Sequence, residues 1–116
     1  MNKRQIGSDY ENEAILYLQD NGYRILEKNF FCKAGEIDII GENEGYLCFI
    51  EVKFRESMSN GFPEEAVDYR KIKRITRSAV YYMTRHGLHD VPVRFDVVSI
   101  LGKDISVIKN AFDAVM

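Results

Sequence analysis

Two short segments that combine apolar residues with charged ones constrain the fold of this chain most strongly. Residues 35–40 read Gly-Glu-Ile-Asp-Ile-Ile, and residues 49–53 read Phe-Ile-Glu-Val-Lys. Runs rich in Ile, Val and Phe that are bounded by turn residues are typical of β-strands. The polar segment that joins them contains Glu44-Gly45, which favours a two-residue turn. The sequence therefore predicts an antiparallel hairpin.

The register of this hairpin decides which side chains share a face of the sheet. If the turn is at residues 44–45, Asp38 lies opposite Glu51, and Glu36 lies opposite Lys53. Burial of the apolar residues selects this pairing or one shifted by two residues. Side chains alternate between the two faces of a strand, so these four residues share one face. We expect this face to carry charged chemistry and the other to be core. The apolar face is predicted to consist of Ile37, Ile39, Cys48, Ile50 and Val52.

Three carboxylates and one ammonium on a single face need a compensating partner. Two like charges about 4 Å apart repel by about 4 kcal/mol at an effective dielectric of about 20. Carboxylate oxygens suit Mg²⁺ or Mn²⁺, and no His or Cys that would favour zinc stands beside them in the sequence. The alternative is a structural salt bridge from Lys53 to Glu36, with Asp38 and Glu51 solvated. The spacing alone leaves both interpretations open.

The remaining elements are predicted from periodicity and capping residues. Ser8 and Glu11 have the spacing of a capping box, which predicts a helix over residues 9–21. Proline followed by two acids predicts a second helix that begins at Pro63 and ends at Gly87. Residues 55–62 have the composition of a loop that borders the charged face. Strands are predicted at residues 23–31, 91–100 and 105–108, with a terminal turn or helix at residues 110–115.

These elements predict an α/β fold with a mixed β-sheet flanked by helices. Three antiparallel strands come first, and the second helix then crosses over to a strand parallel to that of Glu51. At 116 residues we expect a single domain, residues 1–116. No targeting segment or membrane span is recognisable, so we expect a cytoplasmic protein that does not contact membranes. Cys32 and Cys48 lack zinc-type spacing and are expected to be buried free thiols.

The second helix concentrates positive charge in a chain whose net charge is −2. A solvated helix face and a phosphate-contacting face are both compatible with this run. Tyr81 and Tyr82 are expected to pack rather than to stack on bases. Asp96 is expected to pair with Arg94 or with this helix, outside the metal site. The mid-helix cations, which the helix dipole does not explain, are Arg70, Lys71, Arg74 and Arg77.

The pattern of acids and lysine resembles that of a known nuclease superfamily. Asp38, followed after twelve residues by Glu51-Val52-Lys53, is similar to the Asp…(Asp/Glu)-x-Lys core of PD-(D/E)XK nucleases. Ile37 stands where the superfamily name has proline, a relaxation that leaves the acid in place. More closely, the chain resembles the YraN-like family of small bacterial proteins placed in that superfamily. The matching elements run nearly end to end: Gly7, Glu11, Gly22-Tyr23, Asn29, residues 35–38, residues 49–53, Arg55, Gly61, Pro63, Lys71, residues 94–98 and residues 110–112.

The resemblance implies a restriction-endonuclease-like fold, similar to that of Holliday junction resolvases, and a role for each residue of the core. Asp38 and Glu51 would bind Mg²⁺ or Mn²⁺, with the Val52 carbonyl as a further ligand. Lys53 would orient or deprotonate the attacking water.

The resemblance also extends the site beyond this core. Glu36, and Glu11 from the first helix, would orient a water or hold a second metal ion. For Glu11 the capping-box role stays open as an alternative. The nucleic-acid surface would be made by Arg55, Arg70, Lys71, Arg74 and Arg77.

These roles imply a metal-dependent endonuclease that hydrolyses phosphodiester bonds of nucleic acid, DNA rather than RNA, with branched DNA as one substrate. Two alternatives stay open: a non-catalytic nucleic-acid-binding module with a nuclease-like fold, and an accessory subunit completed by a protein partner. The pI of about 5.7 counts against strong, indiscriminate binding to nucleic acid. Related resolvases act as dimers, so a homodimer is expected only by analogy of fold.

Overall fold

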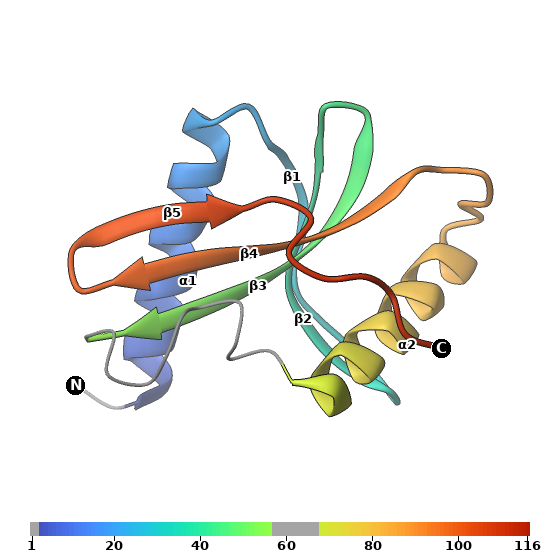
Figure 1. Cartoon of the computed structure of the whole chain (residues 1–116), viewed down its shortest axis with the longest axis horizontal. Helices are drawn as coiled ribbons and strands as arrows, with labels where there is room; N and C mark the ends of the chain where they lie inside the picture. Colours follow the sequence, from blue (N-terminus) through green and yellow to red (C-terminus); the bar gives the residue numbers. More distant parts are fainter. Residues whose placement is uncertain (1–2, 57–67) are drawn as a thin grey trace.

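A five-stranded mixed sheet forms the centre of the molecule, with one helix packed against each face (Figure 1). The computed structural model describes residues 3–56 and 68–116. In chain order the elements are α1 (Lys3–Asp20), β1 (Arg24–Cys32), β2 (Gly35–Asn43), β3 (Tyr46–Arg55), α2 (Tyr69–Arg85), β4 (Val93–Leu101) and β5 (Asp104–Ile108).

The strands lie side by side in the order β1-β2-β3-β4-β5, and β3 and β4 are the parallel pair. α2 lies between β3 and β4 in the chain, in the crossover that a parallel pair of strands requires. The predicted α/β fold, with three antiparallel strands followed by a parallel one, is confirmed. It is consistent with a restriction-endonuclease-like fold.

The hairpin of β2 and β3 has the predicted turn, but its two strands separate before they reach the charged residues. Glu44 and Gly45 both have positive φ angles of 54° and 84°, as a type I′ turn requires. Pairing from this turn ends at Ile39 opposite Ile50. Beyond that point β2 continues beside β1, and β3 continues beside β4, so the sheet forks (Figure 1).

Core side chains cover both faces of the sheet. The side facing α2 holds a core of Phe30, Ile37, Ile40, Leu47, Phe49, Ile75, Ala79, Tyr82, Phe95 and Val97. The side facing α1 holds a second core of Ala14, Leu18, Tyr23, Ile39, Cys48, Ile50, Val98 and Ile100. The expectation of one core face and one charged face is therefore wrong, since α2 covers the face on which Phe49 and Glu51 lie.

The fork also changes the predicted neighbours within the hairpin. Ile37 packs on the α2 side although Ile39 packs on the α1 side, so the alternation of side chains is broken at Asp38. The ladder has ended before Glu36 and Lys53, and the predicted opposition of these two residues is wrong. The reason is that β2 bends with β1 around α2, whereas β3 stays straight beside β4.

The first helix is longer than predicted. It begins at Lys3, and Ser8 lies inside it, so the predicted capping box does not start the helix. A helix interior tolerates residues such as glycine and serine at a cost of about 1 kcal/mol or less, which lets the helix run through this segment. Glu11 is thereby released from the capping role that the sequence had suggested.

The second helix begins later than predicted. Asp68 is its N-cap, and the Asp68 carboxylate accepts a 2.9 Å hydrogen bond from the backbone amide of Lys71. The predicted start at Pro63, and most of the loop predicted at residues 55–62, lie outside the described residues.

The remaining predictions concern the strands that follow and the two thiols. β4 is buried along nearly its whole length, as expected for a strand covered on both faces. Of the predicted turn or helix at residues 110–115, the structure has a turn at residue 110, followed by a segment without regular secondary structure. Cys48 is buried and Cys32 only partly so, and both thiols are free. None of the helices that the structure describes has the length and apolar character of a membrane span.

Candidate functional site

Asp38 lies in the fork between β2 and β3 and faces two pockets. The backbone amide of Val52 donates a 2.8 Å hydrogen bond to Asp38 Oδ2, which ties the carboxylate to β3 where the ladder has ended. One pocket, of about 290 Å³, lies toward α2 and is lined by Asp38, Glu51 and residues of α2. The other, of about 170 Å³, lies toward α1 and is lined by Asp38, Glu11 and Val52, among others. Asp38 thus connects the two sides of the sheet.

Glu51 is nearly buried and is held by two lysines. Its Oε1 atom lies 2.6 Å from Lys71 Nζ and 3.7 Å from Lys53 Nζ. The predicted alternative of a salt bridge from Lys53 to Glu36 is therefore wrong, because Lys53 pairs with the acid two residues before it on β3. Lys71 reaches the site from the first turn of α2, on the side that Glu51 faces.

The two ammonium groups respond differently to this arrangement. Burial, followed by the neighbouring Lys71 ammonium, lowers the pKa of Lys53. Burial also acts against the charged form of Lys71, but the short ion pair with Glu51 outweighs it, and the pKa of Lys71 is raised. Lys71 is therefore the fixed positive charge of the pair, and Lys53 is the lysine that gives up a proton more easily.

The negative charge of Asp38 has little around it that stabilises it. Burial, and then the charge of Glu51, raises the pKa of Asp38 to about 7, although the hydrogen bond from the Val52 amide opposes this shift. At neutral pH the group is therefore divided between its charged and neutral forms. A cation bound beside it would favour the charged form.

Glu11 approaches the same place from α1. Its Oε1 atom is buried without a hydrogen-bond partner among the described residues. Burial, and then the Glu36 and Glu51 carboxylates, raise the pKa of Glu11, whereas Lys28 lowers it. An unpartnered buried carboxylate oxygen is costly, by about 1–3 kcal/mol, so its presence calls for a ligand or a water.

Aromatic packing fixes α1 against the end of β3 beside this site. The rings of Tyr10 and Phe54 stack with centroids 3.9 Å apart, and both residues line the smaller pocket with Glu11. The helix that carries Glu11 is thus positioned by its neighbouring residue.

The other residues predicted for the site lie at different distances from Asp38. Glu36 is exposed but lines the larger pocket together with Arg74. Arg70 and Arg77 lie on the exposed surface of α2. Arg55 is partly buried at the end of β3, where its carbonyl accepts a 2.8 Å hydrogen bond from the Gly102 amide. The structure therefore brings Glu11, Glu36, Asp38, Glu51, Lys53 and Lys71 together, and it places the remaining cations along α2 and at the end of β3.

The sequence did not assign the pairing of Lys71 with Glu51. Lys71 was predicted as a nucleic-acid contact because it belongs to a basic run, and nothing in the spacing places it beside an acid twenty residues earlier. The contact depends on how α2 crosses the sheet.

A second cluster of buried polar groups lies around Asp96, away from the fork. Asp96 is fully buried and receives hydrogen bonds from Arg94 Nε at 2.9 Å, the Tyr23 hydroxyl at 2.7 Å and the Asn110 amide at 2.9 Å. Arg94 Nη2 also donates to Asn43 Oδ1 at 2.7 Å. We call these five residues the Asp96 network. The expectation that Asp96 pairs with Arg94 is confirmed.

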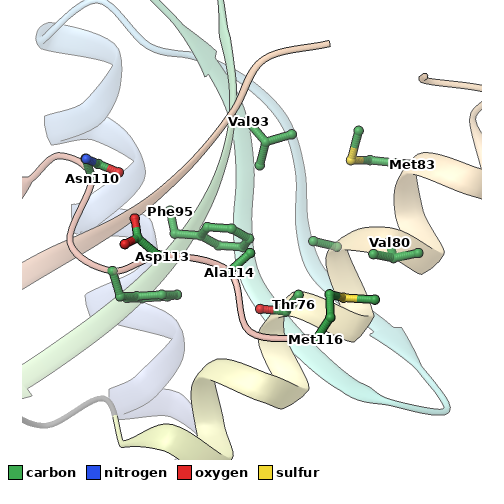
Figure 2. A pocket seen from close by; sticks show the side chains of 11 residues that line it. Thr76, Val80, Met83, Val93, Phe95, Asn110, Asp113, Ala114 and Met116 are labelled. Carbon is green, nitrogen blue, oxygen red and sulfur yellow. The ribbon is translucent and has the colours of Figure 1, made fainter. Parts of the chain in front are cut away.

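A larger and more apolar pocket, of about 410 Å³, lies between α2, β4 and the C-terminal segment. Figure 2 shows the Phe95 ring and the Met83 and Met116 side chains around it. Asp113 is its one charged lining residue, so it lacks the cluster of ionisable groups found at the fork. We therefore take the fork as the candidate functional site.

The group of acids fits a divalent metal ion. No three acidic, histidine or cysteine side chains within residues 3–56 and 68–116 already converge as a complete metal site. Mg²⁺ commonly takes one or two protein carboxylates and fills its remaining positions with water, which suits Asp38 and Glu51. The unpartnered Glu11 oxygen and the raised pKa of Asp38 are the features that a cation would relieve.

The fold and the fork define an α/β protein with a restriction-endonuclease-like sheet and a cluster of acids and lysines where two strands part. The chain belongs to the uncharacterised protein family UPF0102, whose model matches residues 10–100. It is 50% identical to a UPF0102 protein of Lachnoclostridium phytofermentans over 115 residues, or 98% of each chain. It is 43% identical to one of Persephonella marina, covering 92% of each chain. It is 46% identical to one of Acetivibrio thermocellus, covering 96% of this chain and 93% of the relative.

Proposed function

We propose that this protein is a metal-dependent phosphodiesterase that cleaves nucleic acid, of the PD-(D/E)XK nuclease type. The observation that carries the proposal is the imbalance of charge at the fork. Asp38 has a pKa raised to about 7, and Glu11 has a buried oxygen without a partner, within one site that also holds two lysines. Perturbed ionisable groups in a pocket are typical of catalytic sites.

The metal ligands in this proposal are Asp38, Glu51 and the Val52 carbonyl, and the ion is Mg²⁺ or Mn²⁺. Such an ion supplies Lewis-acid polarisation of a phosphate oxygen and neutralises the developing negative charge. The Val52 amide holds the Asp38 carboxylate in place through its hydrogen bond. Glu11 and Glu36 orient water molecules from the α1 side and the α2 side of the fork.

Lys53 is the residue that acts on the attacking water. Its lowered pKa favours transfer of a proton to and from the lysine, and in its charged form it stabilises the negative charge on phosphate. Lys71 has a different role. By pairing with Glu51 at 2.6 Å it positions this carboxylate and keeps a positive charge beside the phosphate.

The nucleic-acid surface in this proposal includes Arg55, Arg70, Arg74 and Arg77. Arg74 and Asp38 both line the pocket of about 290 Å³ at the fork, so the basic surface of α2 begins at the site itself. DNA is the expected partner, with branched DNA as one substrate. A homodimer is a further expectation that rests on analogy of fold. A protein partner that completes the substrate surface is another, and its motive is the weak overall basicity of the chain.

A second candidate is a non-catalytic module that binds nucleic acid. The observation that favours it is the existing compensation of Glu51, which already has Lys71 and Lys53 as partners. In that case the cluster is a structural ion-pair network, and salt-dependent binding occurs without metal uptake.

A pair of variants distinguishes the two candidate functions. We would titrate Mg²⁺ and Mn²⁺ calorimetrically into the wild-type protein, Asp38→Asn and Glu42→Gln. The same samples would then be incubated with end-labelled branched, single-stranded and duplex DNA. Glu42 is the matched control because it is an exposed acid on the same strand as Asp38.

We expect divalent-dependent cleavage by the wild type and Glu42→Gln, and loss of both metal binding and cleavage in Asp38→Asn. Full activity of Asp38→Asn would overturn the assignment of this site. Binding of DNA with no metal uptake in any variant would favour the non-catalytic module.

A further inference from the structure

The outer surface of α2 carries a single continuous stripe of exposed side chains. Its members follow one another at intervals of three or four residues, which places them on one side of a helix. All of them are exposed. They are Arg70, Arg74, Arg77, Tyr81 and Arg85, and we call them the α2 track.

The charge of α2 suits a polyanion. The helix contains six arginines and lysines and no acidic residue, although the whole chain has a net charge of −2. A run of cations along one helix is the electrostatic footprint expected where phosphates are neutralised. The rest of the chain is correspondingly acidic, so the helix is the part of the surface that attracts a nucleic-acid strand most strongly.

The α2 track begins at the fork and leads away from it. Arg74 lines the pocket of about 290 Å³ at the fork, together with Asp38 and Glu51. Farther along the helix, Arg77, Tyr81 and Arg85 line a shallow surface pocket of about 420 Å³. At 1.5 Å per residue, the ten steps along α2 from Lys71 to Tyr81 correspond to about 15 Å.

Tyr81 differs from the tyrosine that follows it. Tyr82 is buried, and its ring packs edge-on against Phe30 and Phe49. Tyr81 is 43% exposed, with an arginine four residues before it and another four residues after it. The expectation that both tyrosines are packing residues is therefore confirmed for Tyr82 and wrong for Tyr81. Helix periodicity explains the difference, because adjacent residues lie about 100° apart around a helix.

An exposed aromatic ring between cations favours one form of nucleic acid. A base can stack on a side chain only if its own face is uncovered, which holds for an unpaired base but not inside a duplex. The neighbouring arginines would meanwhile neutralise the phosphates on either side of that base. The combination therefore selects for an unpaired strand.

We propose that the α2 track binds single-stranded nucleic acid, with an unpaired base stacked on Tyr81, about 15 Å along α2 from Lys71 at the fork. This inference rests on the proposed function, since it supplies that function with its substrate class. A substrate with an unpaired strand would lie along α2 and enter the site past Arg74.

The test is a binding measurement without divalent metal, so that it is independent of cleavage. Full-length wild type, Tyr81→Ala and Tyr81→Phe would be titrated into a fluorescein-labelled dodecamer of thymidylate in EDTA, followed by anisotropy. We expect Tyr81→Ala to bind about 5- to 150-fold more weakly and Tyr81→Phe to bind almost as tightly as wild type. Tyr69→Ala is the matched control and should bind as wild type does.

Tyr69 is a suitable control because it is also an exposed tyrosine on α2, but it lies about 120° around the helix from Tyr81. Arg77→Gln should weaken binding and reduce the slope of log affinity against log salt by about 0.7, the value for one phosphate of a single strand. Circular dichroism would establish that each variant is folded.

The inference is overturned if Tyr81→Ala binds the dodecamer as tightly as wild type, or if wild type binds a duplex of the same length equally well. Either result is independent of catalysis. Tight binding that requires Tyr81, in a protein that never cleaves DNA, would retain the α2 track and reject the nuclease. Cleavage abolished by Asp38→Asn, with binding unaffected by Tyr81→Ala, would do the opposite.

Discussion

Asp96 and Asp38 are both acids inside the same sheet, and the protein treats them in opposite ways. Asp96 is fully buried, and Arg94, Tyr23 and the Asn110 amide donate to its two oxygens. Asp38 has one backbone donor and lies next to another acid, and its pKa is raised to about 7. Hydrogen bonds and an opposite charge stabilise the carboxylate of Asp96, whereas the carboxylate of Asp38 is stabilised only in part.

This difference in surroundings distinguishes an acid that the fold has neutralised from one that is a candidate for function. A buried charge is tolerated when hydrogen bonds and an opposite charge replace the water it has lost. The Asp96 network meets this condition and ties β4 to the segment before β1 and to the chain after β5. The fork does not meet it, and it lies beside two pockets of about 290 Å³ and 170 Å³. The predictions below test this contrast.

The largest expected effect is on stability, from Arg94→Met. The substitution leaves Asp96 buried without its cation, which typically costs about 3–5 kcal/mol. Urea denaturation at pH 7 would measure it, with Lys103→Met, an exposed lysine, as the control within about 0.5 kcal/mol of wild type. A loss of less than about 1 kcal/mol for Arg94→Met would mean that the Asp96 network does not hold the fold together.

Asp38→Asn is expected to act in the opposite direction. The folded pKa is above the unfolded one, so protonation of Asp38 favours the folded state. The stability it contributes is full below about pH 4 and is lost as pH rises through about 7. In metal-free buffer at pH 8 the asparagine variant should therefore be more stable than wild type, by at most about 4 kcal/mol.

Urea denaturation of both proteins from pH 4 to pH 8, with EDTA present, measures this difference. The difference in free energy of unfolding between variant and wild type should increase as pH rises, and it should be small at pH 4. A variant less stable than wild type at pH 8 would show that Asp38 is compensated in the folded protein, as Asp96 is.

Metal binding should narrow the difference in stability between these two proteins. A ligand that binds only the folded state stabilises it by about 2.7 kcal/mol at a concentration one hundred times its Kd. Mg²⁺ or Mn²⁺ should therefore stabilise the wild type at pH 8 and leave Asp38→Asn unchanged, as thermal melts with increasing metal would record. Equal stabilisation of both proteins would place the metal elsewhere.

Glu11→Gln should give the smallest effect of the series. Removing the charge relieves the repulsion from Glu36 and Glu51, so metal-free stability at pH 8 should rise, but by less than in Asp38→Asn. Affinity for the metal should fall and not disappear, because Asp38 and Glu51 stay in place. Calorimetric titration measures this affinity, and an unchanged value would remove Glu11 from the site.

Local sequence patterns predicted the elements and much of their order. The polar, Gly-containing segment between the two strands indicated the hairpin, and Gly45 takes the positive φ angle in its turn without steric cost. The apolar run of residues 91–100 indicated a strand covered on both faces, which is how β4 lies. The Asp38 and Glu51-Val52-Lys53 pattern also identified the acids and the lysine that meet at the fork.

The sequence-based predictions were wrong where packing between distant elements determines the position of a residue. Ile37 was placed with Ile39 by alternation, but the bend of β2 around α2 moves it to the opposite core. Lys53 was expected opposite Glu36 in a continuous ladder, and the ladder ends earlier. Ser8 was expected to cap α1, and the helix continues past it. In each case the local preference is small, and tertiary packing overrides it.

By itself, the sequence determined which residues are candidates for a charged site and which segments form helices and strands, because these depend on residue type and short-range spacing. Only the tertiary structure decided where the sheet forks, and therefore that Asp38 faces both pockets and that Glu11 Oε1 has no hydrogen-bond partner among the described residues. It also decided that Lys71 pairs with Glu51 and that Tyr81 lies outward on α2. The physical reason is that these features depend on how α1 and α2 pack on the sheet, which brings together residues far apart in the chain.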